Sequence, residues 1–291
     1  MTRRNLVLTL AAASASVAQN PPAQNPPSGL KLELVDITVG EFSTSLRLPD
    51  NFGFLSGMPV YLSFRISGYD ADPELSLVNL EYSVEFLDAV GNRFDKPITG
   101  RYSRRVSTLE TAPLPFVRVQ STIPEYVHPG DAKFRVRVTD KRSRQTAEAE
   151  GAIPIRSDLP KTSGKFEILD LKLYRSEAQE NPVTTDAAFA PGDVIWLRFL
   201  LAGFEWKEHE FNLRYGINLL GKDGRTVLSV PEAAAERNAS EYLRAYVPAV
   251  ASIRLERTAR PGPCTLIIHA VDGVAKQESK ISLPFQILAL K

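Results

Sequence analysis

The chain has 291 residues, with 35 basic against 34 acidic side chains and a single cysteine. This even charge balance argues against the basic stripe of a nucleic-acid-binding protein, and one cysteine excludes an internal disulfide. The length and an apolar share of 43% allow two ordinary domains, each with its own core.

The first residues, MTRRNLVLTLAAASASVAQN, combine a positive head, a short apolar stretch and a small-residue cleavage pattern. These features predict a signal peptide, which we place at residues 1–18. The adjacent arginines also fit a twin-arginine signal, so the export route stays open. The apolar part is shorter than the roughly 20 residues that span a bilayer, and no later apolar run is long enough. We expect an exported protein, periplasmic or extracellular, that does not span the membrane.

A proline-rich segment, residues 19–29, follows the expected cleavage site and contains Gln-Asn-Pro-Pro twice. Proline fixes φ and has no backbone N–H, so this composition predicts an extended tether rather than part of a core.

The rest of the chain repeats itself. The matching pairs are PVYLSFRISGY (59–69) with VIWLRFLLAGF (194–204), LEYSVEFLDAVGN (80–92) with LRYGINLLGKDGR (213–225), and the Pro-Gly blocks at 129–145 and 261–277. Apolar residues alternate with a period of two, as in strands with one buried face. The spacing between the copies changes only in loops, which packing does not fix. We infer an internal duplication.

Each copy predicts six short strands separated by turn signals. They are expected near residues 31–38, 59–67, 80–88, 116–123, 132–139 and 147–155, and near 166–173, 194–202, 213–220, 250–256, 264–271 and 279–287. This pattern is typical of an antiparallel β-sandwich. One helical turn is expected at residues 231–237, because Ser229 can cap it and Pro231 suits a first turn.

A polar stretch with proline and glycine, RSDLPKTSGK, separates the two copies. We therefore predict an all-β protein with one domain at residues 30–156, a linker at 157–164 and a second domain at 165–291.

The chain resembles the immunoglobulin-like and fibronectin-type sandwiches of exported bacterial proteins. The resemblance rests on Tyr82 and Tyr215, where immunoglobulins place a third-strand tryptophan, and on the Pro-Gly-x-x-x-φ-x-φ-x-φ-x-Asp blocks at 129–140 and 261–272. It extends over residues 30–291 and implies two tandem immunoglobulin-like antiparallel β-sandwich domains. Such folds serve adhesion, carbohydrate binding, chaperoning and spacing, so the function does not follow from the fold.

The sequence does not predict catalysis. The three histidines, His128, His209 and His269, fall in unrelated contexts, and no nucleophile-elbow, metal-binding or phosphate-loop motif occurs. Cys264 takes an inward position in its strand, which favours a buried structural thiol over a reactive one. We expect no enzymatic activity and no cofactor.

One acidic stretch, YDADPE, offers Asp70, Asp72 and Glu74 at alternate positions. Calcium uses such oxygen ligands, so the three residues form a calcium candidate, although no metal is expected. Acidic residues also favour turns, and the counterpart FEWKEHE at 204–210 does not keep the pattern.

The segment at 204–210 places Phe204, Trp206 and His209 in a connection at the tip of the second domain. Aromatic residues there can stack on a sugar or anchor a protein, or they can cover the end of the core.

A second candidate contact surface lies on the strand at 194–202. Trp196 and Leu200 are expected to face outward, where the first copy has Tyr61 and Arg65. An apolar outer stripe in one copy predicts a surface that is covered by the sister domain, a local loop or a partner.

These features predict a non-catalytic exported protein that binds or spaces through protein–protein contacts, with an unknown protein or a glycan as partner. Two alternatives stay open: a carbohydrate-binding accessory protein that uses residues 204–210, and a two-domain periplasmic chaperone. The oligomeric state and the relative orientation of the domains also stay open.

Overall fold

The computed structural model describes residues 29–40, 48, 49, 51–72, 74–105, 115–183 and 188–289. The predicted signal peptide and tether lie outside the described residues, with the exception of Gly29. The described part of the chain contains fifteen strands and no helix. It therefore holds no helix that could cross a membrane.

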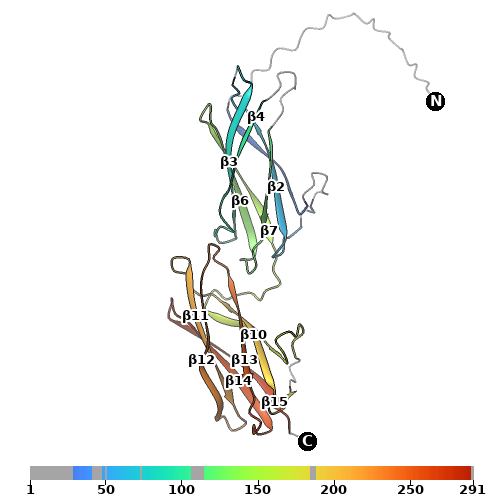
Figure 1. The fold of residues 1–291 in the computed structure, drawn as a ribbon, viewed down its shortest axis with the longest axis vertical. Helices are drawn as coiled ribbons and strands as arrows, with labels where there is room; N and C mark the ends of the chain where they lie inside the picture. Colours follow the sequence, from blue (N-terminus) through green and yellow to red (C-terminus); the bar gives the residue numbers. More distant parts are fainter. Residues whose placement is uncertain are drawn as a thin grey trace, which may run out of the picture.

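The N-terminal half, residues 29–155, forms two antiparallel sheets (Figure 1). Their strand orders are β1-β2-β5 and β4-β3-β6-β7. The strands are β1 (Lys31–Thr38), β2 (Pro59–Ser67), β3 (Leu77–Leu87), β4 (Ile98–Arg105), β5 (Phe116–Thr122), β6 (Gly130–Asp140) and β7 (Thr146–Ile155).

The C-terminal half, residues 166–289, also forms two sheets, ordered β13-β10-β8 and β12-β11-β14-β15-β9. Neighbouring strands are antiparallel except β9, which runs parallel to β15. The strands are β8 (Glu167–Tyr174), β9 (Ala188–Phe189), β10 (Val194–Ala202), β11 (Glu210–Leu220), β12 (Thr226–Ala239), β13 (Tyr246–Arg254), β14 (Gly262–Asp272) and β15 (Gln277–Ile287).

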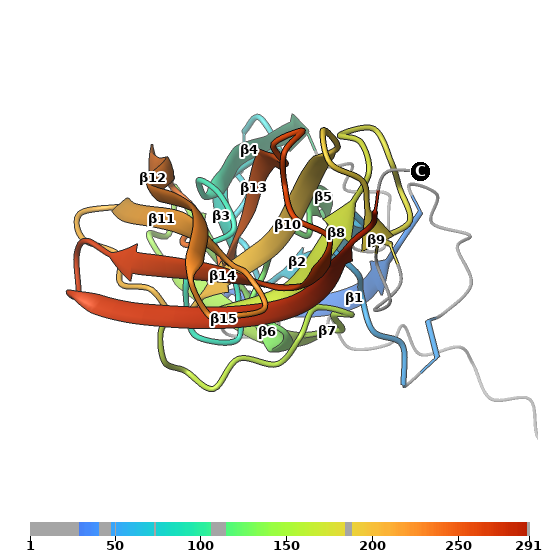
Figure 2. The same cartoon turned by 90° about the horizontal axis from the view of Figure 1, so that it is seen from below.

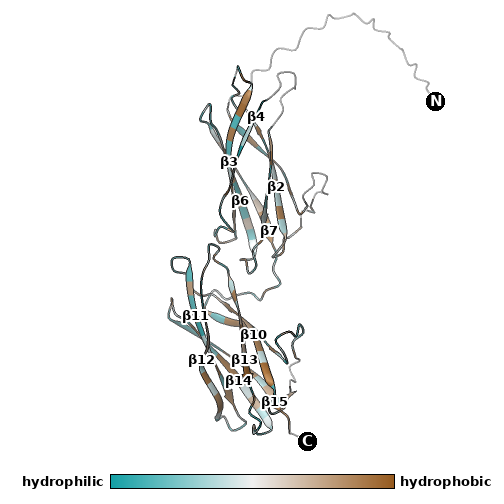
Figure 3. Ribbon diagram, viewed as in Figure 1, coloured by the Kyte–Doolittle hydropathy of each residue, from teal (hydrophilic) through white to brown (hydrophobic). Residues whose placement is uncertain are grey.

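The cores follow from the alternation of apolar and polar residues along the strands, visible as alternating brown and teal in Figure 3. In β2 and β10 alike, every second side chain is at most 3% exposed; these are Val60, Leu62, Phe64, Ile66, Ile195, Leu197, Phe199 and Leu201. Successive side chains of a strand point to opposite faces, so one face of each strand is apolar. In each half the apolar faces of the two sheets bury each other.

The two halves share their strand order: β1-β2-β5 corresponds to β8-β10-β13, and β4-β3-β6-β7 to β12-β11-β14-β15. Smaller features correspond as well. A β-bulge interrupts the pairing of β1 with β2 and of β8 with β10. Phe54 forms a parallel bridge with Ile155, and Phe189 pairs in parallel with Ile287.

Two glycines at the ends of β2 and β10 adopt the same conformation. Gly68 has φ of 70° and Gly203 has φ of 69°, values that side chains rarely tolerate. A Cβ atom at either position would lie 2.0 Å from a backbone carbonyl oxygen, that of Gly29 or that of Lys165. The glycines therefore allow the chain to pass close to the segment that enters β1 or β8.

Two aspartates, Asp140 and Asp272, are fully buried at the ends of β6 and β14. Asp140 accepts the backbone N–H of Asp70 at 2.6 Å, and Asp272 accepts that of Glu205 at 2.9 Å. Each carboxylate also accepts an N–H two residues further on, within its own hairpin. Because their oxygens receive these donors, the buried carboxylates hold two loops together instead of destabilising the core.

The helical turn predicted at residues 231–237 is wrong. These residues belong to β12, an edge strand in which Ala234 lies opposite Tyr215 of β11. Alanine and glutamate favour helices, but pairing with a neighbouring strand overrides that weak preference.

Two further differences concern exposure. Strand β4, which the sequence did not predict, contains no buried residue, so it carries no apolar alternation. Tyr82 is only half-buried, although its ring contacts Phe64 at 5.9 Å between centroids, whereas the corresponding Tyr215 is 1% exposed.

The two halves lie end to end along the long axis of the molecule (Figure 1). Viewed along that axis, the sheets of the C-terminal half lie in front of those of the N-terminal half (Figure 2).

Candidate functional site at the junction of the two halves

The junction is formed by the loop between β12 and β13, residues 240–245, which contacts the N-terminal half. Its Tyr242 is 8% exposed and belongs to the apolar core of that half. The ring packs edge-on against Phe94, with 6.2 Å between centroids. A side chain of the C-terminal half thus completes the core of the N-terminal half.

The hydroxyl group of Tyr242 ends in a polar cluster. It donates a hydrogen bond to Asp88 Oδ2 at 3.3 Å and accepts the backbone N–H of His128 at 3.3 Å. Burial, followed by the nearby Asp88 charge, raises the pKa of Tyr242, so the hydroxyl keeps its proton and acts as a donor.

Asp88 is the centre of this cluster, with a side chain that is fully removed from solvent. Its Oδ2 lies 2.8 Å from Nδ1 of His128, and its Oδ1 accepts the backbone N–H groups of Val90 and Asn92. Burial would raise the pKa of the Asp88 carboxyl, but the hydrogen bonds from His128 and Asn92 outweigh it and hold that pKa below its ordinary value.

Further hydrogen bonds join the loop at residues 240–245 to the N-terminal half. The backbone N–H of Ala245 donates to the carbonyl oxygen of Tyr126 at 2.8 Å, and Asn92 Nδ2 donates to the carbonyl oxygen of Leu243 at 3.4 Å. Hydrogen bonds, the packing of an aromatic ring and a buried carboxylate therefore all hold the two halves together at the junction.

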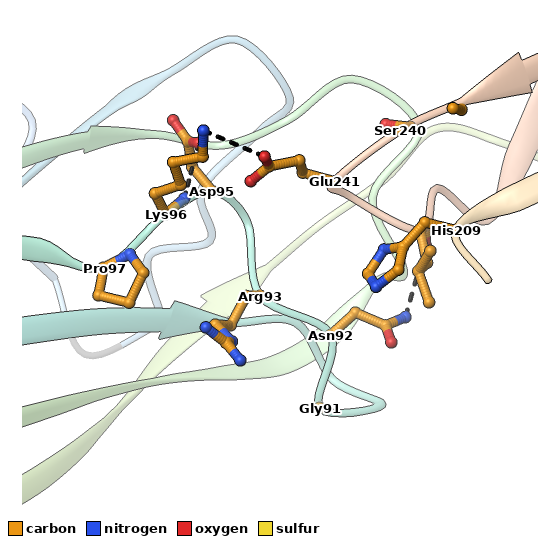
Figure 4. A pocket seen from close by; sticks show the side chains of 11 residues that line it. Gly91, Asn92, Arg93, Asp95, Lys96, Pro97, His209, Ser240 and Glu241 are labelled. Atoms are coloured by element: carbon orange, nitrogen blue, oxygen red, sulfur yellow. Dashed lines mark hydrogen bonds and ion pairs between the residues drawn. The ribbon is translucent and has the colours of Figure 1, made fainter.

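A cleft of about 620 Å³ opens beside this junction, with walls from both halves (Figure 4). The N-terminal half contributes residues 91–93 and 95–97, and the C-terminal half contributes His209, residues 239–241 and Leu243. At one end of the cleft, Lys96 Nζ and Glu241 Oε1 form an ion pair of 3.1 Å between the halves.

The stripe predicted on β10 is covered in part by the junction. Leu200 is 9% exposed and packs in a small cluster with Tyr246 of β13. Tyr126 of the N-terminal half and Leu159 of the connecting segment pack against the same cluster, so both a local strand and the other half contribute. Trp196 lies further along the strand and is half-buried.

The aromatic residues at the tip, Phe204 and Trp206, pack inward. Phe204 is 9% exposed, and the partly buried Trp206 ring lies 5.0 Å from Phe211 and 5.7 Å from Phe204 between centroids. This geometry matches the interpretation that these rings cover the end of the core. His209 is separate from them and exposed.

His209 lies in a two-residue turn closed by backbone hydrogen bonds of 2.9 Å in both directions between Lys207 and Glu210. Glu208 and His209 have φ of 51° and 64°, so both central residues are left-handed, as in a type I′ turn. Asn-Gly is the favoured pair at such a turn, because larger side chains are strained there.

The calcium candidates are engaged by an arginine. Arg142 Nε lies 3.0 Å from Asp70 Oδ2, and Arg142 Nη1 lies 3.1 Å from Asp72 Oδ2. Asp72 Oδ1 also accepts the backbone N–H of Glu74. Within the described ranges, no group of three or more histidine, cysteine or acidic residues could hold a metal ion.

The remaining candidates of the sequence are separate from one another. His128 belongs to the junction, His269 Nε2 pairs with Glu278 Oε2 at 3.1 Å, and Cys264 is buried. Burial raises the pKa of the Cys264 thiol, which keeps it in the less reactive protonated form.

Tyr242 and Asp88 were not found by sequence reasoning. Tyr242 is an aromatic residue in a polar loop, and its partner lies 154 positions away in the chain. The repeat carried no sign of this contact, because it joins different surfaces of the two halves.

No protein-family model and no curated protein matches the chain. Among solved structures, the Pseudomonas fluorescens alkylpurine DNA glycosylase AlkC, bound to DNA containing an abasic site analogue, is 17% identical with a TM-score of 0.29, covering 43% of this chain and 31% of that one. Dimeric latent PorU from Porphyromonas gingivalis is 11% identical with a TM-score of 0.26, covering 90% and 24%. Red sea bream transglutaminase is 7% identical with a TM-score of 0.26, covering 89% and 31%. The chain spans about a quarter to a third of the length of these proteins, and similarities this distant carry no argument about function.

Proposed function

We propose that the chain is a non-catalytic, exported spacer and binding protein that acts through protein–protein contacts. Its architecture in this proposal is two tandem immunoglobulin-like β-sandwich domains, residues 30–156 and 165–291, joined by a linker at 157–164. The observation that carries the proposal is the junction, in which Tyr242 occupies the core of the preceding half. A fixed junction between end-to-end modules sets a distance and an orientation, which a spacer requires.

The duplication draws support from features that strand count alone would not produce. The halves share strand order, a bulge at one place, and the close backbone approach at Gly68 and Gly203. Each half also has a buried aspartate at the end of the corresponding strand, Asp140 or Asp272, that ties the same two loops together. Two domains of unrelated origin would not be expected to share this whole set of local structural features.

The settings of the histidines support a non-catalytic role. His128 contacts Asp88 within the junction, and His269 pairs with Glu278 on an outer face. Each of these two rings has a carboxylate as its side-chain partner, and Cys264 is buried. The carbohydrate-binding alternative draws less support, because the Trp206 ring packs against Phe211 instead of presenting a free face.

Export rests on the sequence of residues 1–18, and we propose a periplasmic or extracellular location on that basis. A chain with one buried thiol suits an oxidising compartment, since it offers no second cysteine for a wrong pairing.

The test is the motion of the two halves in solution, measured by ¹⁵N NMR relaxation on the full chain. We expect both halves to tumble with one common correlation time, and Tyr242→Ala to give two shorter ones. Tyr102→Ala is the matched control, because this ring also packs on the N-terminal core but lies on β4. Independent tumbling in the unaltered chain would show that the rigid-spacer proposal is wrong.

A further inference from the structure

The cleft at the junction presents two cationic or polar side chains from opposite walls. Arg93 comes from the N-terminal half and His209 from the C-terminal half, and both side chains border the same cavity in Figure 4. The Arg93 side chain is 58% exposed, and its Nη1 reaches Glu85 Oε1 only at 3.9 Å. Most of the five N–H donors of the guanidinium group are therefore available to a ligand.

The backbone of His209 is strained at its place beside the cleft. It occupies a left-handed position in a turn where glycine or asparagine would fit with less strain. Among the described residues, its ring nitrogens have no hydrogen-bond partner. A strained backbone that presents an unpaired imidazole to a cavity is more typical of a binding site than of a turn selected for stability.

Three other charged side chains, Asp95, Lys96 and Glu241, line the cleft. Lys96 and Glu241 bind each other at one end, and the Asp95 carboxylate accepts the backbone N–H of Lys96 at 2.7 Å. Arg93 and His209 also face the cavity; Arg93 has only the 3.9 Å ion pair with Glu85, and neither side chain has a hydrogen-bonded carboxylate among the described residues.

We propose that this cleft binds an anionic group, a carboxylate or a phosphate, between Arg93 and His209. Arginine presents paired donors that match the oxygens of either group, and the imidazole supplies a donor from the other wall. The inference rests on the proposed fixed junction, because the two walls belong to different halves. A ligand held by both walls would stabilise the junction by mass action.

The experiment is a titration of the full chain with inorganic phosphate, glucuronate and glucose, followed through the histidine ring signals in NMR spectra. We expect the His209 signal to shift saturably with phosphate or with glucuronate, and not with neutral glucose. The anion that binds more tightly shows whether the cleft prefers a phosphate or a carboxylate. Arg93→Gln, followed through the His209 ring, and His209→Asn, followed through the backbone amide signal of Arg93, should each weaken binding about tenfold or more, the loss expected for one charge-assisted hydrogen bond.

Asparagine is chosen at position 209 because it tolerates a positive φ, so the turn is kept. His269→Asn is the matched control, since this partly exposed histidine lies on β14, pairs with Glu278 and does not line the cleft, so its loss should leave affinity unchanged. The proposal is overturned by no saturable shift with either anion, by an equal shift with glucose, or by full affinity in Arg93→Gln. One common correlation time without anion binding would reject the site alone, whereas two correlation times would reject the rigid spacer.

Discussion

Gly68 and Gly203 show how a single residue type can be required by its neighbours. At both positions a side chain would collide with a backbone carbonyl group, in addition to meeting an unfavourable φ. Gly57 has φ of 80°, but a Cβ atom there would have open space around it. A substitution at Gly57 therefore meets only the unfavourable φ, whereas one at Gly68 or Gly203 also meets a steric clash with the backbone.

We predict that Gly68→Ala destabilises the chain by about 3 kcal/mol or more, against about 1 kcal/mol for Gly57→Ala. Both replacements meet the conformational cost, and only the first forces the backbone near Gly29 to move. Urea unfolding curves of the two variants measure the difference. Equal losses would show that the segment entering β1 shifts without cost.

Asp88 gives the junction a defined dependence on pH. Its pKa in the folded chain is held below the ordinary value, so its contribution is complete above the unfolded pKa of about 4 and is lost as the pH falls through the lower folded value. Asp88→Asn cannot lose this contribution on acidification, because it never has the charge.

We therefore expect the stability gap between the unaltered chain and Asp88→Asn to be largest near neutral pH and to shrink below about pH 4. Urea midpoints measured between neutral and acidic pH provide the comparison. Asp131→Asn serves as the control, since this exposed residue of β6 should give a small gap at every pH. A gap that is constant with pH would contradict the assigned role of the Asp88 charge.

Among the elements, the strands with a strict apolar alternation could be predicted and the others could not. The predicted bounds of β2 and β10 agree with the structure, because each buries one complete face. Strand β4 buries no residue, and β12 has the composition of a helix, so neither showed the period of a half-buried strand. Their strand form comes from hairpin pairing with the preceding strands β3 and β11, which depends on backbone hydrogen bonds and not on an apolar pattern.

The hairpins that follow β6 and β14 depend on their buried aspartates. We predict that Asp140→Ala costs about 3 kcal/mol, because the N–H groups of Asp70 and Arg142 lose their acceptor inside the protein. Asp272→Ala should have a similar effect in the C-terminal half. Amide hydrogen exchange should show loss of protection in both tied loops, and protection that survives at Asp70 would contradict this role.

The candidate site was only partly accessible from sequence, because its contacts join residues far apart in the chain. The stripe at Leu200 was predicted to be covered, and its cover does include Tyr126 of the other half. His209 was predicted as a contact residue because of its loop, but its opposite wall at Arg93 was not. Alternation along a strand reports which side is buried, and it carries no information about which distant loop lies above it.

In the whole molecule, the two halves are unequal in what they need from each other. Tyr242 fills a place in the N-terminal core, whereas the two main cores of the C-terminal half contain residues of that half alone. We predict that residues 165–291 fold when expressed alone, and that residues 30–156 fold with reduced stability. Calorimetry of the fragments and of the full chain tests this, and an N-terminal fragment that melts as in the full chain would refute it.

The position of Tyr242 also has a consequence for biosynthesis. A ribosome completes residues 29–155 well before the aromatic ring that finishes their interior exists, and domains generally fold as units from the N-terminus. The early half must therefore persist with the place beside Phe94 unfilled until Tyr242, 87 residues after Ile155, has been synthesised. The last step of folding is then the insertion of the Tyr242 ring into the N-terminal core, so this core is completed only after the second half has been synthesised.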